Sequence, residues 1–323
     1  MRILITGATG FIGSSLVLYL SSKGYSLIIA SRKVSDIMLP NIMQVMIGEI
    51  TSETDWAEVF KDKNIDVVIH LAARVHVMQE TTTEPLEEFR QTNTAGTLSL
   101  ARQAATAGVS RFILLSSIKV NGERTTADKP FTADDTRIPT DPYGISKYEA
   151  EQGLRELAVQ TGMEVVIIRP PLVYGPGVKA NFLSMMRWLH KGIPLPLGAI
   201  HNQRSLVALD NLVDLITTCI DHPAAANQAF LVSDGEDLST SALLQRLGHG
   251  LGKPACLLPI PQNFLTSSLN LLGKGEIAQR LCGSLQIDMS KTRELLTWVP
   301  PVTVDEALYK TAQAYLASKR REI

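Results

Sequence analysis

The chain has 323 residues, of which 45% are hydrophobic and 20% are charged. This composition is typical of a folded globular protein with one large or two coupled domains, and it excludes a mainly disordered chain. Lysine and arginine (31) nearly balance aspartate and glutamate (32), for a net charge of −1, so the basic composition typical of a nucleic-acid binder is absent and we expect no nucleic-acid partner.

The three cysteines, Cys219, Cys256 and Cys282, lie far apart in the sequence and have neither metal-ligand nor disulfide-framework spacing. This usage predicts a reducing compartment, the cytoplasm, and no metal site. The first residues run directly into a predicted strand, which argues against a signal peptide. The most apolar stretch is interrupted by Pro259 and Pro261, so we expect no membrane span.

Predicted strands and helices alternate over the first half of the chain. We expect strands at residues 2–6, 26–30, 66–72, 111–116 and 164–169, and helices at residues 12–23, 86–107 and 143–161. This alternation predicts an α/β fold, a Rossmann-type doubly wound parallel sheet, over residues 1–170. Frequent prolines after Arg169 predict a smaller C-terminal α/β region over residues 171–323, with some elements returning to the main sheet.

A glycine-rich segment, residues 7–13, follows the first predicted strand and opens the first predicted helix. Gly7 permits a tight turn, Gly10 lets a pyrophosphate approach the backbone, and Gly13 lets the helix pack closely on the strand. Free N–H groups at the helix start suit phosphates. A plain glycine-rich turn is the alternative. We predict a dinucleotide site that includes Gly7, Thr9, Gly10, Phe11, Ile12 and Gly13.

The end of the second predicted strand bears on the choice of nucleotide. An NAD site usually has an acidic residue there, which accepts a hydrogen bond from the ribose 2′-hydroxyl. This chain has Ser31 and Arg32 instead, a hydroxyl and a cation that suit a 2′-phosphate. A solvated surface arginine is the alternative. The sequence therefore favours NADP(H) and leaves NAD(H) open.

Tyr143 and Lys147 are four residues apart at the start of a predicted helix and so share one face. A free tyrosine, with a pKa of about 10, is a poor base at neutral pH. A neighbouring ammonium and the nicotinamide cation are expected to lower that pKa. Ser117, at the end of a predicted strand, would hydrogen-bond the same substrate oxygen. A core tyrosine with a surface lysine is the alternative, but beside the glycine segment we predict a catalytic Ser117, Tyr143 and Lys147.

These motifs together resemble the extended short-chain dehydrogenase/reductases, specifically the nucleotide-sugar branch of the NAD-dependent epimerase/dehydratase family. The resemblance covers nearly the whole chain and includes residues 48–50, 70–73, 93–97 and 169–177. It implies further cofactor contacts, and it implies that Tyr143 and Lys147 contact the cofactor as well. The added residues are Glu49, Ile50, Leu71, Ala72, Ala73, Asn93, Ser116, Pro170 and Val173.

The resemblance also implies a UDP-sugar substrate. Arg204 matches the family arginine on the diphosphate, a role that suits a guanidinium fork, although a surface salt bridge is the alternative. His76 could contact the sugar or serve as a structural histidine. The substrate-binding residues expected on this basis are Arg74, His76, Ser117, Lys119, Asn181, Phe182, Leu195, Pro196, Leu197 and Arg204.

The residues after Ser117 restrict which activity of this branch the chain is expected to have. The 4,6-dehydratases have an Asp-Glu pair where this chain has Ile118 and Lys119, which cannot eliminate water. Asn121 replaces a tyrosine usual in epimerases. The chain is similar to a bacterial subgroup that reduces UDP-4-keto-6-deoxy-N-acetylglucosamine to UDP-N-acetylquinovosamine for surface polysaccharide, including the O-antigen of lipopolysaccharide. Alternatives are a UDP-glucose or UDP-N-acetylglucosamine 4-epimerase with tightly bound NAD, and a non-catalytic NADP-sensing regulator.

The reaction that the resemblance implies is reversible hydride transfer at C4, with Tyr143 moving the proton, Ser117 orienting the oxygen and Lys147 holding the nicotinamide ribose. The family also implies a homodimer, paired through the helices at residues 86–107 and 143–161. The subunit core could equally claim the apolar positions of this seam. Those positions are Leu98, Ala101, Ala105, Leu154, Leu157 and Ala158.

Overall fold

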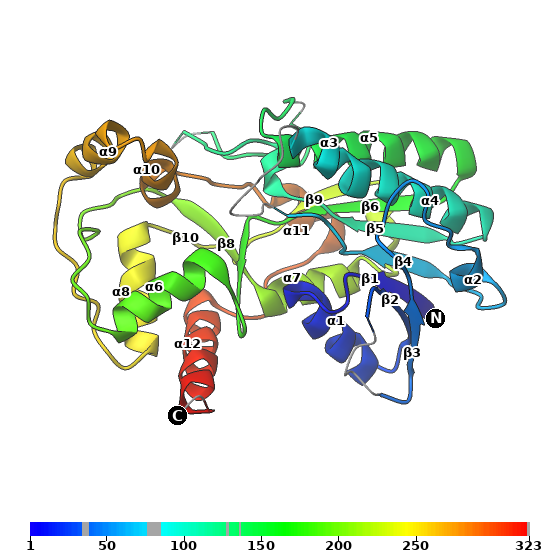
Figure 1. The fold of residues 1–323 in the computed structure, drawn as a ribbon, viewed down its shortest axis with the longest axis horizontal. Helices are drawn as coiled ribbons and strands as arrows, with labels where there is room; N and C mark the ends of the chain where they lie inside the picture. Colours follow the sequence, from blue (N-terminus) through cyan, green and yellow to red (C-terminus); the bar gives the residue numbers. More distant parts are fainter. Residues whose placement is uncertain (34–38, 76–84, 127–128, 136, 322–323) are drawn as a thin grey trace.

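A seven-stranded parallel sheet forms the centre of the computed structural model, which describes residues 1–33, 39–75, 85–126, 129–135 and 137–321 (Figure 1). The strand order is β3-β2-β1-β4-β5-β6-β9. The direction of the chain across the sheet reverses between β1 and β4, the position where such folds bind ligands. The strands are β1 (Arg2–Thr6), β2 (Ser26–Ser31), β3 (Ile42–Met46), β4 (Val67–His70), β5 (Arg111–Leu115), β6 (Glu164–Arg169) and β9 (Ala229–Leu231).

Helices cover both faces of this sheet, because the strand side chains that point to either face are apolar. In β1, Ile3 and Ile5 face the core under α1 (Phe11–Ser22) and α7 (Leu209–Thr218), and Leu4 faces the opposite core. Figure 1 shows the two helix layers above and below the sheet. The opposite layer contains α2 (Ala57–Phe60), α3 (Pro85–Phe89), η1 (Arg90–Gly96), α4 (Thr97–Thr106) and α5 (Pro142–Thr161). The predicted doubly wound fold is confirmed.

Two parts of this layer structure differ from the expectation. The helix expected over residues 86–107 is three consecutive segments, α3, the π-helix η1 and α4. The edge strand β3 was not expected, because its residues are only partly buried and show no clear apolar alternation. No residue range was predicted for β9. This strand pairs in parallel with β6, although about sixty residues separate the two strands.

The second half of the chain adds a three-stranded sheet of order β10-β8-β7 and a core of its own. Its strands are β7 (Leu172–Tyr174), β8 (Arg204–Ala208) and β10 (Asp237–Leu238). α6, α8 and α12 supply most of the apolar side chains of this core. The remaining elements are η2 (Ile118–Val120), α6 (Ala180–His190), η3 (Pro223–Ala225), α8 (Thr240–Gly250), α9 (Gln262–Leu271), α10 (Gly275–Cys282), α11 (Ser290–Leu296) and α12 (Val304–Arg321).

The helix positions expected at a dimer seam are largely used within the subunit. Ala101, Leu154 and Leu157 are buried in the core beneath α4 and α5, and Leu98 lies against Gly153 where the two helices cross. Close packing of these helices on each other and on the sheet therefore accounts for the apolar stripe. These positions therefore give no support to a dimer, and the homodimer stays a prediction.

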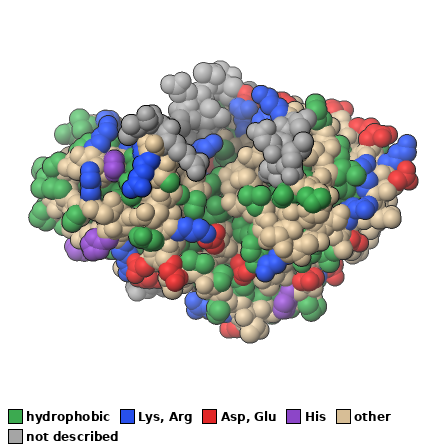
Figure 2. All heavy atoms as spheres, turned by 90° about the horizontal axis from the view of Figure 1, so that it is seen from below, with side chains coloured by type: hydrophobic (Ala, Val, Ile, Leu, Met, Phe, Trp, Pro, Cys, Tyr) green, Lys and Arg blue, Asp and Glu red, His purple; other side chains and the backbone are tan. Residues whose placement is uncertain are grey.

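Charge on the surface is mixed. On the face drawn in Figure 2, Lys and Arg side chains are interspersed with Asp and Glu, as the near-zero net charge leads one to expect. In the part of the chain that the structure describes, no helix combines the length and the apolar character needed to cross a membrane.

Candidate nucleotide and catalytic site

The turn between β1 and α1 has the geometry that the glycine segment predicts. Gly7 has a φ of +71°, and a Cβ there would lie 2.6 Å from the Ala72 nitrogen. A Cβ on Gly13 would lie 2.1 Å from the Gly7 carbonyl oxygen, so only glycine fits at the close approach of α1 to this turn. The helix begins after Gly10 with no acidic residue in its first turn, which leaves its N–H groups and positive end for an anion.

A pocket of about 470 Å³ opens at this turn, at the carboxyl ends of β1, β2 and β4 and just beyond β3. Its walls bring together many of the residues predicted to hold the dinucleotide, together with Arg74 from the predicted substrate set. These residues are Gly7, Thr9, Gly10, Ser31, Arg32, Glu49, Ile50, Leu71, Ala72, Ala73 and Arg74. A pocket at this position, with a glycine cradle at its base, fits a dinucleotide.

Four further residues line the pocket and were missed from the sequence: Ala30, Ile47, Val75 and Thr92. Ala30 directly precedes Ser31, and Thr92 directly precedes Asn93, so extending each motif by one residue would have found both. Ile47 directly precedes the recognised 48–50 segment and Val75 directly follows Arg74, so the same one-residue extension would have found these two as well.

Ser31 and Arg32 lie on the pocket wall, but each already has a partner. The Ser31 hydroxyl donates to the Lys33 carbonyl oxygen at 2.6 Å. Arg32 Nη1 lies 3.7 Å from Glu49 Oε1, and both side chains are largely exposed. The cation predicted to receive a 2′-phosphate therefore stands beside a carboxylate of the same pocket, which reduces its net attraction for a phosphate.

Other predicted cofactor residues lie behind the pocket lining. Asn93 is fully buried, and its side chain donates to the Arg74 carbonyl oxygen at 3.0 Å and accepts from the Arg74 nitrogen at 2.8 Å. It also donates to Ser146 Oγ at 3.1 Å, which ties the pocket wall to α5. The others that do not line this pocket are Phe11, Ile12, Gly13, Ser116, Tyr143, Lys147, Pro170 and Val173.

The three predicted catalytic residues come from two elements that meet beyond β5. Tyr143 and Lys147 lie one turn apart on α5, and Ser117, which follows β5, lies close enough to Tyr143 to lower the pKa of its phenol. The Tyr143 ring packs edge-on against Phe89 with ring centroids 5.9 Å apart. Lys147 is 1% exposed. The expected constellation is thus assembled in one place.

The protonation of this group differs from the expectation. Burial raises the pKa of Tyr143 to about 12, more than the Ser117 hydrogen bond lowers it, and the charge of Asp141 adds to the rise. Burial lowers the pKa of Lys147 to about 8, against the raising effect of Glu151. The expected lowering of the Tyr143 pKa is therefore wrong for the protein chain by itself, because desolvation penalises the phenolate. At neutral pH Tyr143 is a phenol, able to donate a proton.

The start of α5 is fixed by a side-chain cap. Asp141 Oδ2 accepts a hydrogen bond from the Gly144 nitrogen at 2.8 Å, and Asp141 Oδ1 accepts one from Lys119 Nζ at 3.0 Å. Lys119 Nζ also lies 3.5 Å from Glu123. Lys119, predicted to contact substrate, thus holds the cap of the helix that carries Tyr143.

Arg204 is the residue predicted to contact the diphosphate of the substrate. It is partly buried on β8, where Nη1 donates to the carbonyl oxygens of Arg280 and Gly283 at 3.2 and 3.1 Å. It makes no ion pair with a carboxylate of the described residues, and burial lowers its pKa. A half-desolvated guanidinium held only by carbonyl groups keeps its charge uncompensated and suits a diphosphate.

The other predicted substrate residues are spread over the second region. Phe182 is buried and stacks on Tyr174 with ring centroids 5.4 Å apart. Leu195 and Leu197 are buried in the same core, so none of these three side chains lines the pocket described above. Asn181 and Pro196 are exposed, and His76 lies outside the described residues. The substrate role of these residues stays a prediction.

Comparison with known proteins gives a consistent result. Residues 3–233 match the NAD dependent epimerase/dehydratase family. The chain is 51% identical over 320 residues to a UDP-glucose 4-epimerase of Vibrio cholerae, covering 99% of this chain and 97% of that protein. It is 25% identical, over 100% of this chain and 98% of the other, to an N-acetyl-α-D-glucosaminyl-diphospho-ditrans,octacis-undecaprenol 4-epimerase of Escherichia coli O157:H7.

Solved structures agree with this result at the level of the fold. A UDP-glucuronic acid 4-epimerase from Bacillus cereus in complex with NAD superposes with a TM-score of 0.78 at 20% identity, covering 98% of this chain and 99% of that one. A UDP-glucose 4-epimerase with UDP-glucose from Thermotoga maritima gives a TM-score of 0.76 at 24% identity, covering 99% and 100%. The family match and the 51% identical relative show that the chain belongs to the NAD-dependent epimerase/dehydratase family of enzymes, in the extended short-chain dehydrogenase/reductase class.

Proposed function

We propose that this enzyme catalyses reversible hydride transfer at C4 of a UDP-linked hexose and that it works as a 4-epimerase with a retained NAD. The observation that carries the proposal is the Tyr143 phenol, which lies beside Ser117 and one turn before the buried Lys147. The name of the 51% identical relative, a UDP-glucose 4-epimerase, supports the same reaction and substrate.

The residues present supply each step that such a reaction needs from the protein. The bound dinucleotide supplies the acceptor and donor of the C4 hydride. Ser117 orients the C4 oxygen, and Tyr143 gives that oxygen a proton in the reducing step and removes it in the oxidising step. The buried ammonium of Lys147 favours the phenolate while the proton is away. An epimerase uses the same groups twice, on the two faces of the sugar at C4.

Elimination of water is not part of the proposal. Ile118, at the place of the dehydratase acid, is a buried apolar residue. Lys119, at the place of the base, is paired with Asp141 and Glu123. Neither residue can move a proton between C5 and C6 of the sugar, so the chemistry stays at C4.

The pocket around the ribose bears on the cofactor. Glu49 stands 3.7 Å from Arg32, and a carboxylate at this place repels a 2′-phosphate. The Ser31 hydroxyl is occupied by the Lys33 carbonyl oxygen. Both features favour NAD(H) over NADP(H), contrary to the preference inferred from the sequence. Retained NAD is the cofactor state that an epimerase needs.

The second candidate is the 4-reductase that forms UDP-N-acetylquinovosamine in surface-polysaccharide synthesis. Arg32 favours it, because this cation is exposed at the pocket wall and could turn from Glu49 to a 2′-phosphate. A reductase must exchange its cofactor at every turnover, whereas an epimerase regenerates it. The two candidates share Ser117, Tyr143 and Lys147 and separate on this difference.

The test uses purified, extensively desalted protein. We expect interconversion of UDP-glucose and UDP-galactose, or of their N-acetyl forms, without added nucleotide. Stoichiometric reduction of added NADP by UDP-N-acetylquinovosamine, with no interconversion of the UDP-sugars, would establish the reductase instead. Activity in neither assay, with protein that binds the dinucleotide in calorimetry, would contradict both candidates and favour a non-catalytic nucleotide sensor.

Arg204 offers a separate test of the substrate. Arg204→Met is expected to raise KM for the UDP-sugar by about 10- to 100-fold, because a hydrogen-bonded charge is lost from the diphosphate, while kcat changes less. Steady-state kinetics measures both values. The matched control is Arg246→Met, since Arg246 pairs with Glu236 and Asp305 on the surface. An unchanged KM in the Arg204 variant would remove this residue from the substrate site.

A further inference from the structure

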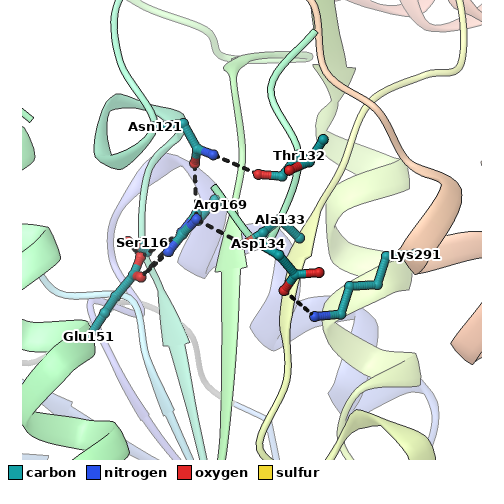
Figure 3. Close-up of polar contacts among 8 residues, drawn as sticks. All are labelled: Ser116, Asn121, Thr132, Ala133, Asp134, Glu151, Arg169 and Lys291. Atoms are coloured by element: carbon teal, nitrogen blue, oxygen red, sulfur yellow. Dashed lines mark hydrogen bonds and ion pairs between the residues drawn. The ribbon is translucent and has the colours of Figure 1, made fainter. Parts of the chain in front are cut away.

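A buried ion pair, Glu151 with Arg169, joins α5, the helix that carries Tyr143 and Lys147, to the end of β6 (Figure 3). Glu151 on α5 is fully buried, and Arg169 at the end of β6 is 3% exposed. Arg169 Nε donates to Glu151 Oε1 at 2.9 Å, and Arg169 Nη2 donates to Oε2 at 2.5 Å, so the guanidinium grips the carboxylate with two nitrogens. The proposed mechanism gives neither residue a role.

The carboxylate of this pair acts on Lys147 through the helix. Glu151 follows Lys147 by one turn of α5, and it is the group that opposes the lowering of the Lys147 pKa by burial. The other groups around Lys147 do not supply a negative charge. His70 on β4 is held by Thr6 and Thr97, and its pKa is lowered to about 3, so it is neutral.

Of the other groups on and beside α5, Tyr143 is uncharged and the charged ones form ion pairs. Tyr143, on the same helix, is a phenol at neutral pH. From η1, which packs on α5, Arg90 pairs with Glu149 on the outer side of the helix. Asp141, at the start of α5, is paired with Lys119. Among the residues that the structure describes, Glu151 is therefore the carboxylate whose charge favours the buried Lys147 ammonium.

The same carboxylate holds the strand end that carries Ser117. The Ser116 hydroxyl donates to Glu151 Oε1 at 2.5 Å, and the Ile118 nitrogen donates to the Pro170 carbonyl oxygen at 3.0 Å. Ser117 lies between these two fixed residues. Glu151 thus contacts the neighbour of one catalytic residue and lies one helical turn from another.

Arg169 also hydrogen-bonds the loop that follows η2. Its Nη1 donates to Asn121 Oδ1 at 3.1 Å and to the Ala133 carbonyl oxygen at 3.2 Å. The Asn121 side chain in turn donates to the Thr132 carbonyl oxygen at 2.7 Å. Figure 3 shows these residues converging on Arg169 from α5, from the segment after β5 and from the loop at 132–134. Every polar group of the pair is occupied.

Stability by itself does not explain this pair. A buried ion pair is often no more stabilising than apolar residues of the same volume, because both charges must be desolvated. Another Arg–Glu pair joins the starts of β5 and β6, where Arg111 lies 2.6 Å from Glu164, at the end of β6 opposite to Arg169. That pair is remote from Tyr143 and provides an internal comparison.

We propose that Glu151, held by Arg169, is a positioning residue for the reaction proposed above: its charge keeps the Lys147 ammonium protonated, and its hydrogen bond to Ser116 aligns Ser117. The inference rests on the proposed roles of Tyr143, Ser117 and Lys147. It assigns two functions to one carboxylate, one electrostatic and one geometric, and different substitutions separate them.

The test is the pH profile of kcat for Glu151→Gln and Glu151→Asp. The glutamine keeps an oxygen for Ser116 but loses the charge, so Lys147 loses its proton more readily. We expect the alkaline limb of kcat, which begins near the Lys147 pKa of about 8, to move down by about one pH unit. Aspartate keeps the charge, so we expect the alkaline limb of Glu151→Asp to return towards the wild-type position. Its side chain is shorter, so we expect its kcat to stay about 10-fold below that of wild type.

The control is Glu164→Gln, which removes the same charge from the Arg111 pair. It is expected to lower the unfolding temperature without changing the alkaline limb. Equal limbs for wild type, Glu151→Gln and Glu151→Asp would overturn the electrostatic role, and full kcat in Glu151→Asp would overturn the geometric one. Should Glu151→Gln fail to fold, Glu151→Gln/Arg169→Met removes both charges of the pair and is expected to move the limb downward by less, because loss of the Arg169 cation partly offsets loss of the Glu151 anion.

The outcome can be separated from that of the proposed function. If Tyr143→Phe keeps full activity, the proposed catalytic roles are wrong and the Glu151 profiles lose their premise. If Tyr143→Phe is inactive and the limb does not move, only the role of Glu151 fails.

Discussion

Tyr143→Phe is expected to lower kcat by about 10²- to 10⁴-fold, because the substitution removes the proton donor and acceptor at C4. The hydroxyl that is removed is the group assigned to proton transfer, and it lies beside Ser117. The phenyl ring keeps its edge-on contact with Phe89, so the fold should survive. Steady-state kinetics with the UDP-sugar, together with a thermal unfolding curve, measures both effects.

The matched control for this variant is Tyr315→Phe. Tyr315 is a buried tyrosine of α12 that packs edge-on against His190, in the core of the second region. Removal of its hydroxyl is expected to leave kcat at the wild-type value. Activity of the Tyr143 variant within about threefold of wild type would falsify the assignment of Tyr143, since a general acid contributes more than this.

Gly13→Ala is expected to disrupt the nucleotide site and to lower the free energy of unfolding by about 3 kcal/mol or more. The new Cβ would lie 2.1 Å from the Gly7 carbonyl oxygen and 2.8 Å from the Ala8 Cα, which are backbone atoms that cannot move aside singly. Either α1 shifts away from β1 or the turn changes, and both responses move the N–H groups intended for the pyrophosphate. Differential scanning calorimetry and dinucleotide titration measure the two losses.

Gly48→Ala is the matched control for stability. A Cβ on Gly48 meets no atom within 4 Å, so the added methyl group is expected to leave the unfolding temperature nearly unchanged. If Gly13→Ala unfolds at the same temperature as Gly48→Ala and binds the dinucleotide normally, the close approach of α1 to the turn is not what this glycine provides.

The architecture and the family could be predicted from local sequence patterns. The run from β1 through Gly7 and Gly13 into α1 is local, because a tight turn and a close helix approach restrict residue type over only seven positions. Tyr143 and Lys147 also lie within one helical turn, so their spacing alone places them on one face. The core-facing strands were recognisable because burial on both faces demands continuous apolar runs.

The electrostatics of the site, in contrast, depend on how distant segments meet in the fold. Glu49 stands beside Arg32 because β3 brings the chain back to the end of β2, and this weakens the cofactor preference drawn from Ser31 and Arg32. The pKa of Tyr143 rises because packing desolvates it, which spacing does not reveal.

The same limit applies to the Glu151–Arg169 pair. Eighteen residues separate its two members, and its further bonds reach Ser116 and the loop at residues 121–133. Nothing in the local pattern distinguishes Glu151 from an exposed helix carboxylate. Local rules specify backbone shape and helix faces, whereas the charge next to a buried group depends on distant segments meeting in the folded chain.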